Sequence, residues 1–298
     1  MQSLGLINVP INLGCNKFGV EEAGDFLRKN GLYDIFNGDY FVDLGDIDCK
    51  PLGGMDSRQP FDMKNIDEIL YSCSLLADKV YSTLEAGVFP LIFGGDHSLS
   101  WGSINGVVRK HGRIGVVYID AHGDFNTRET SVTGNVHGMH MAYLMGYGEE
   151  RFVDFYSRGH KLNHEDVFFL GTRSLDAGEV ELADNNGFHI KTTEYIKENG
   201  VKRTCDDLLA CIENRGLEHL HISLDIDSLD PVIAPGTGVP EKNGLCYGDV
   251  ESILKSVFST GKVVSIDLVE FNHRFDKHGM TFDLVRKFLN VIKENYRI

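Results

Sequence analysis

Eight short apolar runs recur along the chain and alternate with longer amphipathic segments, and this alternation constrains the fold more than any other feature. Each run has about the length of a strand and is rich in Val, Ile and Phe, as buried parallel strands are. We expect strands at 4–9, 40–45, 89–94, 114–120, 166–171, 188–192, 219–225 and 263–270. Apolar residues three and four apart predict helices at 65–86, 202–215, 248–259 and 281–295. The pattern predicts an α/β fold with a doubly wound, mostly parallel sheet flanked by helices on both faces.

The chain carries no linker-like stretch, low-complexity tract or internal repeat, so we expect a single domain over residues 1–298. Residues 1–14 have no basic stretch before their apolar residues, which is typical of a strand rather than a signal peptide. No apolar run approaches the roughly 20 residues needed to span a bilayer. The six cysteines are scattered and form no C-x-x-C pair, which favours reduced thiols. We therefore expect a cytoplasmic protein with no membrane partner.

The charge balance bears on the choice of partner. Asp and Glu total 44 against 29 for Lys and Arg, which gives a formal net charge of −15. A nucleic acid partner would call for a basic patch, so this balance argues against one. An acidic chain suits a small cationic substrate, although acidity alone more often serves solubility.

Metal-ligand residue types gather at the ends of three of the expected strands, which is where parallel sheets bind ligands. Side chains two apart on an extended chain point the same way, so the residues of each stretch can converge on one point. Together the three stretches supply two histidines and four aspartates: His97, Asp120, His122, Asp124, Asp225 and Asp227.

Four carboxylates packed together cannot all stay ionised without cations, because like charges at close range repel. Two divalent ions supply a charge of +4 against −4, and bridging carboxylates let six side chains serve two ions roughly 3.5–4 Å apart. The oxygen-rich set, with two imidazoles and no thiolate, favours Mn²⁺ over Zn²⁺. Each motif alone is more typical of a turn or a helix cap, but their combination predicts a site for two Mn²⁺ per subunit.

These stretches resemble the ureohydrolases, the family of the arginases and agmatinases. The resemblance rests on GGDHS (94–98), DAHGD (120–124) and SLDIDSLDPVIAPGTG (223–238), and it extends through nearly the whole chain. It implies a homo-oligomer, either a trimer or a hexamer. It also implies that one manganese is held by His97, Asp120, Asp124 and Asp225, and the other by Asp120, His122, Asp225 and Asp227.

The segment after DAHGD separates substrates within the family, and here it resembles the arginase version. The resemblance implies that Asn126 and Thr133 recognise an α-carboxylate, and that Asp176 and Glu179 face an α-ammonium group. Agmatine has no carboxylate, so such a pocket favours arginine. The chain departs from the family at Val239, where threonine is usual near the guanidinium group, and a lost hydroxyl there would reduce activity or shift the substrate.

The resemblance implies an arginase-type amidinohydrolase of arginine metabolism, which splits L-arginine into L-ornithine and urea by attack of a metal-bridging hydroxide. Glu270 is expected to pair with the guanidinium group, which matches a carboxylate in shape. Asp124 is expected to accept a hydrogen bond from the hydroxide, and His137 to return a proton to the leaving amine. Two alternatives stay open. One is a ureohydrolase of agmatine, another guanidino acid or formiminoglutamate, and the other is a non-catalytic metal- or amino-acid-binding protein on the same fold.

Overall fold

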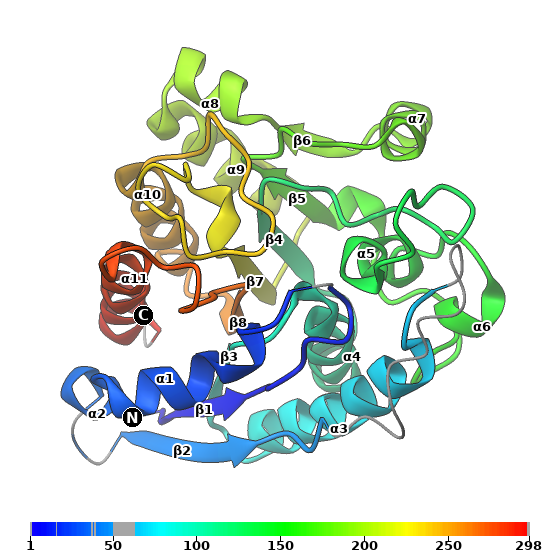
Figure 1. Ribbon diagram of the computed structural model, residues 1–298. Helices are drawn as coiled ribbons and strands as arrows, with labels where there is room; N and C mark the ends of the chain where they lie inside the picture. The colour runs from blue at the N-terminus through cyan, green and yellow to red at the C-terminus, as the bar shows by residue number, and fades with distance from the viewer. Residues whose placement is uncertain (1, 16, 37, 39, 50–62, 297–298) are drawn as a thin grey trace.

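The computed structural model describes residues 2–15, 17–36, 38, 40–49 and 63–296, and it has a central sheet with helices on both faces (Figure 1). The described residues form an eight-stranded sheet in the order β2-β1-β3-β8-β7-β4-β5-β6, and every neighbouring pair is parallel. The strands are β1 (Leu4–Asn8), β2 (Phe41–Asp46), β3 (Phe89–Phe93), β4 (Gly115–Ile119), β5 (Val167–Leu170), β6 (His189–Lys191), β7 (Leu220–Asp225) and β8 (Val263–Val269). All eight predicted strands are confirmed, with each end within one residue of its prediction.

Helices cover the sheet on two sides, as the doubly wound prediction requires. One face carries α3 (Ile66–Glu85), α4 (Ser100–His111), α5 (His140–Leu144), α6 (Glu150–Val153) and α7 (Ala177–Asn186). The other carries α1 (Ala23–Lys29), α2 (Leu32–Ile35), α8 (Thr193–Asn199), α9 (Val201–Asn214), α10 (Tyr247–Phe258) and α11 (Met280–Asn295). The four predicted helices are confirmed as α3, α9, α10 and α11, whereas the other helices carried no periodicity that we singled out.

Two hydrophobic clusters fill the space between the sheet and its two helical layers. Successive side chains of a strand point to opposite faces, so each buried strand feeds both clusters. In β3, Phe89, Leu91 and Phe93 join the cluster under α9–α11, while Ile92 joins the one under α3 and α4. This two-sided burial explains why the strands read as continuous apolar runs.

The sheet order places the chemically interesting motifs side by side. The strands β3, β8, β7 and β4 are consecutive in the sheet, and each is followed by one of the acidic or histidine-bearing stretches. Because all strands are parallel, their carboxyl ends meet at one edge. In the described part of the chain, no helix has the length and apolar character that crossing a bilayer demands.

Candidate metal centre

A sharp glycine turn after β3 brings His97 into the site. Gly94 and Gly95 have φ values of 87° and 77°, a left-handed conformation that favours glycine. A Cβ atom on Gly95 would lie 2.5 Å from the carbonyl oxygen of Val9, so no larger residue fits there without a shift. His97 follows as the first residue of a short 3-10 helix, His97–Leu99, and is 1% exposed.

The stretch after β4 supplies Asp120, His122 and Asp124 through a turn rather than an extended chain. The backbone N–H of His122 donates to Asp120 Oδ1 at 2.7 Å. Asp124 has a φ of 54°, which is uncommon for a residue with a side chain and occurs often at functional sites. The predicted convergence therefore occurs, but its route differs from the alternating geometry that the spacing suggested.

The stretch after β7 also turns. The carboxylate of Asp225 accepts the backbone N–H of Asp227 at 2.7 Å and so caps the 3-10 helix Ile226–Ser228. The carboxylate of Asp227 in turn accepts the backbone N–H of Ala121 at 3.4 Å, which ties this turn to the one after β4. Both aspartates are 2% exposed.

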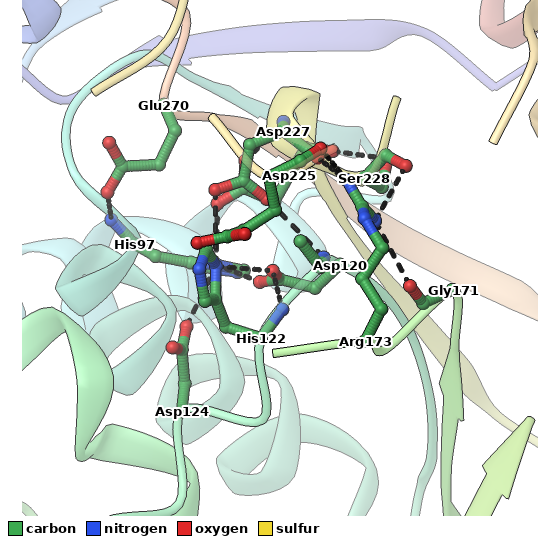
Figure 2. Close-up of polar contacts among 12 residues, drawn as sticks. His97, Asp120, His122, Asp124, Gly171, Arg173, Asp225, Asp227, Ser228 and Glu270 are labelled. Carbon is green, nitrogen blue, oxygen red and sulfur yellow. Dashed lines mark hydrogen bonds and ion pairs between the residues drawn. The ribbon is translucent and has the colours of Figure 1, made fainter. Parts of the chain in front are cut away.

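Four of the six predicted ligands form an inner group around His97 (Figure 2). His97 Nδ1 lies 2.9 Å from Asp120 Oδ2, 3.2 Å from Asp124 Oδ2 and 3.2 Å from Asp225 Oδ2. We call His97, Asp120, Asp124 and Asp225 the inner group. Its four side chains are at most 10% exposed, so the charges meet in a nearly dry place.

The remaining ligands form an outer group that shares one carboxylate with the inner group. His122 Nδ1 lies 3.2 Å from Asp227 Oδ2 and 3.4 Å from Asp120 Oδ1. We call Asp120, His122 and Asp227 the outer group. The His122 side chain is 22% exposed, so this group is the one that opens toward solvent.

The donor set fits a pair of divalent cations. Asp120 Oδ2 is buried and, although His97 Nδ1 lies 2.9 Å away, it accepts no well-aligned hydrogen bond from a described residue. No described lysine or arginine lies within salt-bridge distance of Asp120, Asp124, Asp225 or Asp227. Four carboxylates without basic partners need positive charge from elsewhere. Two divalent ions would balance them, and the oxygen-rich ligand set with two imidazoles suits Mn²⁺.

The pKa values of His97 and His122 also indicate that the surrounding carboxylates stabilise positive charge. Burial lowers the pKa of His97, but the carboxylates of Asp120, Asp124 and Asp225 outweigh it and raise that pKa well above its ordinary value. Burial likewise opposes a charged His122, yet Asp227 and Asp120 raise its pKa. A site that stabilises cationic imidazoles so strongly also stabilises metal cations.

Glu270, the residue after β8, is held between His97 and His137. Its φ is 62°, and its backbone N–H donates to the carbonyl of Gly95 at 3.0 Å. Glu270 Oε1 accepts the backbone N–H of His97 at 2.9 Å and lies 3.0 Å from His137 Nδ1. Glu270 Oε2 is buried without a partner among the described residues, so one carboxylate oxygen remains for a ligand. Burial lowers the pKa of His137, but Glu270 outweighs this and raises it to about 9.

A cavity of about 250 Å³ opens directly over this centre. Its lining combines metal-ligand candidates with every predicted substrate residue: His122, Asp124, Asn126, Thr133, His137, Asp176, Glu179, Asp225, Asp227 and Glu270. Val239 and Glu241 also line it, together with Ser131, Asn135, Gly138 and Ser174. A hollow of about 420 Å³ between β5, β6 and α9 is larger, but its lining lacks a carboxylate–histidine cluster of this kind.

Two of the predicted substrate residues are joined to each other. Asn126 Nδ2 donates to Asp176 Oδ2 at 2.9 Å. The oxygens of Glu179 accept the backbone N–H groups of Phe125 at 3.0 Å and Asp176 at 2.9 Å, so this buried acid anchors the turn before α7. Burial raises the pKa of Glu179 to about 7. Thr133 Oγ1 accepts a backbone N–H, which leaves its O–H available to donate.

Sequence reasoning missed four residues that shape the centre. Tyr118 donates to Asp124 Oδ2 at 2.6 Å, and Ser223 lies 2.8 Å from His97 Nε2. Each stands two residues before an aspartate ligand on the same strand, so the strand alternation could have identified both.

The other two missed residues carry no such signal. His140 is fully buried, and its ring nitrogens could complete a metal site with His97 and Asp124. Arg173 contacts the backbone of the outer group. From the sequence alone, His140 would be interpreted as one histidine of a loop and Arg173 as an ordinary polar residue.

Comparisons with known proteins show which family the chain matches. The arginase family matches residues 2–292 of the chain. The chain is 34% identical over 286 residues to the arginase of Bacillus subtilis (strain 168), covering 94% of each protein. Its structure is similar to that of the Bacillus caldovelox arginase, with a TM-score of 0.91, 31% identity and 98% of both chains covered. It is also similar to an Entamoeba histolytica arginase in complex with L-ornithine, with a TM-score of 0.89, 28% identity, and coverage of 98% and 99%.

Proposed function

This chain belongs to the arginase family and is a hydrolase of the guanidino C–N bond, and we propose that it splits L-arginine into L-ornithine and urea. One observation carries the proposal. Two histidines and four aspartates meet beneath a cavity whose wall also holds the buried carboxylate of Glu270, and one oxygen of this carboxylate has no partner in the described part of the chain. That arrangement provides a place for divalent cations, a place for a guanidinium group and room for a substrate of amino-acid size.

We propose that the inner and outer groups would each hold one Mn²⁺, with Asp120 common to both groups. The family resemblance assigns Asp225 to both ions as well, and its carboxylate lies in the inner group. When bound, two such ions supply Lewis-acid chemistry that lowers the pKa of a water molecule from about 15.7 to about 7. Tyr118 fixes Asp124 by donating to its Oδ2, while the Asp124 side chain also lines the cavity. Asp124 is thereby positioned to accept a hydrogen bond from the attacking water.

Glu270 binds the guanidinium group, and His137 faces the amine that leaves when the C–N bond breaks. The planar guanidinium group donates to Glu270 Oε2, which no described residue occupies. His137 turns its Nδ1 toward Glu270 Oε1, so its Nε2 is the nitrogen left for the substrate. A proton on that nitrogen is given to the leaving amine when the C–N bond breaks.

The α-amino-acid end of arginine fits the outer wall of the cavity. Asn126 and Thr133 each retain an N–H or O–H donor for the α-carboxylate. Asp176 is exposed at the rim and faces the α-ammonium group, while Glu179 supports it by accepting its backbone N–H. A substrate without the carboxylate would leave the donors of Asn126 and Thr133 unpaired, which disfavours agmatine.

A turnover assay across candidate substrates tests the function. We expect ornithine and urea from arginine in the presence of Mn²⁺, no turnover after exhaustive chelation, and kcat/KM for agmatine at least about 100-fold lower. The assay also follows formamide release from formiminoglutamate. Faster cleavage of agmatine or formiminoglutamate would replace arginine as the substrate. Tight manganese binding without turnover of any of these compounds would point to a non-catalytic binding protein.

Glu270→Gln tests the guanidinium assignment. The amide keeps the shape but loses the charge that pairs with the guanidinium group, so we expect kcat/KM to fall at least about 1,000-fold while manganese stoichiometry is unchanged. Glu165→Gln is the matched control, because Glu165 pairs with Arg215 before β5, at the opposite edge of the sheet. Full activity of the Glu270 variant would remove this residue from the mechanism.

We further propose a homo-oligomer working in the cytoplasm. All six cysteines are free in the structure, which suits a reducing compartment. Sedimentation of the manganese-loaded protein tests the assembly: a trimer or hexamer is expected, and a monomer at micromolar concentration contradicts it.

A further inference from the structure

The guanidinium group of Arg173 gathers six backbone carbonyls from three separate segments, and Figure 2 shows it beside the outer group. Its Nε donates to one of them, its Nη1 to two and its Nη2 to three. The acceptors are Lys242 O at 3.0 Å, Gly171 O and Ser228 O at 3.1 Å each, Asp227 O and Glu241 O at 2.8 Å each, and Leu229 O at 3.4 Å.

These contacts use the whole donor capacity of the side chain. A guanidinium group has five N–H donors in a fixed fork, so six acceptors engage every donor and one N–H is shared. Among the described residues, no carboxylate lies within salt-bridge distance of Arg173. Its charge therefore serves to hold main-chain oxygens together rather than to neutralise an acid.

The segments that Arg173 joins are those that build the outer half of the site. Residues 227–229 belong to the turn that carries Asp227. Residues 241–242 end the loop whose Val239 and Glu241 line the cavity. Gly171 ends β5 with a φ of 90°, and the backbone N–H of Arg173 donates to Ala121 O at 2.8 Å, between the ligands Asp120 and His122. A single residue thus connects the ends of β4, β5 and β7 with the cavity wall.

The inner group is held in another way. His97 is held by side chains, with Nε2 2.8 Å from Ser223 Oγ and Nδ1 3.1 Å from Tyr118 Oη. Asp124 accepts from Tyr118 as well. None of these contacts of His97 and Asp124 involves Arg173, so these two residues of the inner group are held without the carbonyl contacts described above.

We propose that Arg173 is a positioning residue that fixes Asp227 and the loop 231–242 for the outer ion and the substrate. The proposal rests on the two-ion centre proposed above. Lysine at this position keeps the positive charge but offers only three donors from one nitrogen. It therefore cannot hold three segments at once, and Arg173→Lys isolates the positioning role from the charge.

Manganese binding in single-site backgrounds provides the test. His97→Asn leaves the outer group intact, and His122→Asn leaves the inner group intact. Adding Arg173→Lys should weaken Mn²⁺ binding, measured by equilibrium dialysis, at least about 10-fold in the first background and less than about 2-fold in the second. Equal weakening in both backgrounds, or none in the first, overturns the proposal. Because the readout is binding, it also separates this inference from the proposed turnover of arginine.

Amide hydrogen exchange gives a second readout that needs neither background. In Arg173→Lys alone, we expect amides of residues 226–245 to exchange at least about 10-fold faster and those of 97–111 to be unchanged. In the same variant, KM for arginine should rise more than kcat falls, because the loop 231–242 forms part of the cavity wall. Arg113→Lys is the matched control, since Arg113 pairs with Asp166 at the opposite edge of the sheet. Uniform loosening of the protein, or unchanged exchange at 226–245, contradicts a positioning role.

Discussion

Buried aspartates occur at both ends of the parallel strands, but their countercharges come from different sources. We call the side where the strands begin the amino edge of the sheet, and the side where they end the carboxyl edge. Asp166 precedes β5 at the amino edge and is fully buried. Its two oxygens accept from Arg113 Nε and Nη2 at 2.8 and 2.9 Å, and from Arg215 Nε at 2.5 Å. At the carboxyl edge, Asp120 and Asp225 are buried to the same degree, yet no described arginine or lysine side chain pairs with them.

The pKa values of Asp166 and Asp225 are shifted in opposite directions for this reason. Burial raises the pKa of Asp166, but hydrogen bonds from Arg113 and Arg215 outweigh it and hold that pKa below its usual value. Burial and the charges of Asp227 and Asp120 raise the pKa of Asp225 well above its usual value. The amino edge is therefore complete within the chain, whereas the carboxyl edge is complete only with cations bound. Such local incompleteness marks a functional site rather than a structural one.

Among these changes, Asp225→Asn at the carboxyl edge should have the largest effect on turnover. It removes one of the four charges that hold the ions, so we expect turnover of arginine to fall at least about 1,000-fold, the equivalent of roughly 4 kcal/mol. The metal-free variant should be as stable as the parent or more so, because a repulsive buried charge is gone. Urea release and thermal unfolding in a chelator measure the two effects. A clear loss of metal-free stability would mean that Asp225 is structurally paired, as Asp166 is.

Added Mn²⁺ should raise the free energy of unfolding only in proteins whose carboxyl edge is intact. Binding to the folded state adds RT ln(1 + [L]/Kd), about 2.7 kcal/mol per site at a free ion concentration 100 times Kd. The parent and an Asp166 variant should both gain this stability, while Asp225→Asn should gain much less. Denaturant unfolding at several Mn²⁺ concentrations measures it. An equal gain in all three proteins would place the ions elsewhere.

The two edges also differ in how much of their structure can be predicted from the sequence. The strands and the candidate ligand residues followed from local patterns, because each buried strand is a continuous apolar run and its motif comes directly after it. The turns that aim Asp124 and Asp227 did not follow, since a left-handed residue or a 3-10 turn leaves no periodicity. Asp166 pairs with Arg113 and Arg215, which lie 53 and 49 positions away in the sequence. Only the packed sheet brings such residues together, which also explains why Arg173 went unnoticed.

Asp166→Asn at the amino edge should have the smallest effect on turnover. Its pattern should be the opposite of that of Asp225→Asn, with stability lost and activity kept. We expect unchanged turnover and a loss of about 2 kcal/mol in unfolding free energy at pH 7, moderated because Arg113 remains half-exposed. The folded-state pKa of Asp166 is lowered, so its contribution is fully present above the unfolded value of about 4 and is lost as pH falls through the folded value. The gap in unfolding free energy between parent and variant should therefore be constant from pH 7 to about pH 5 and shrink as the pH falls below about 4, measured by urea unfolding in a chelator. Asp206→Asn is the matched control, because the only ion pair of Asp206 with a described residue is with an exposed lysine of its own helix, and its loss should leave stability nearly unchanged. A gap that does not shrink below about pH 4, or a loss of turnover at pH 7, would show that the two edges do not divide stability and function as their countercharges indicate.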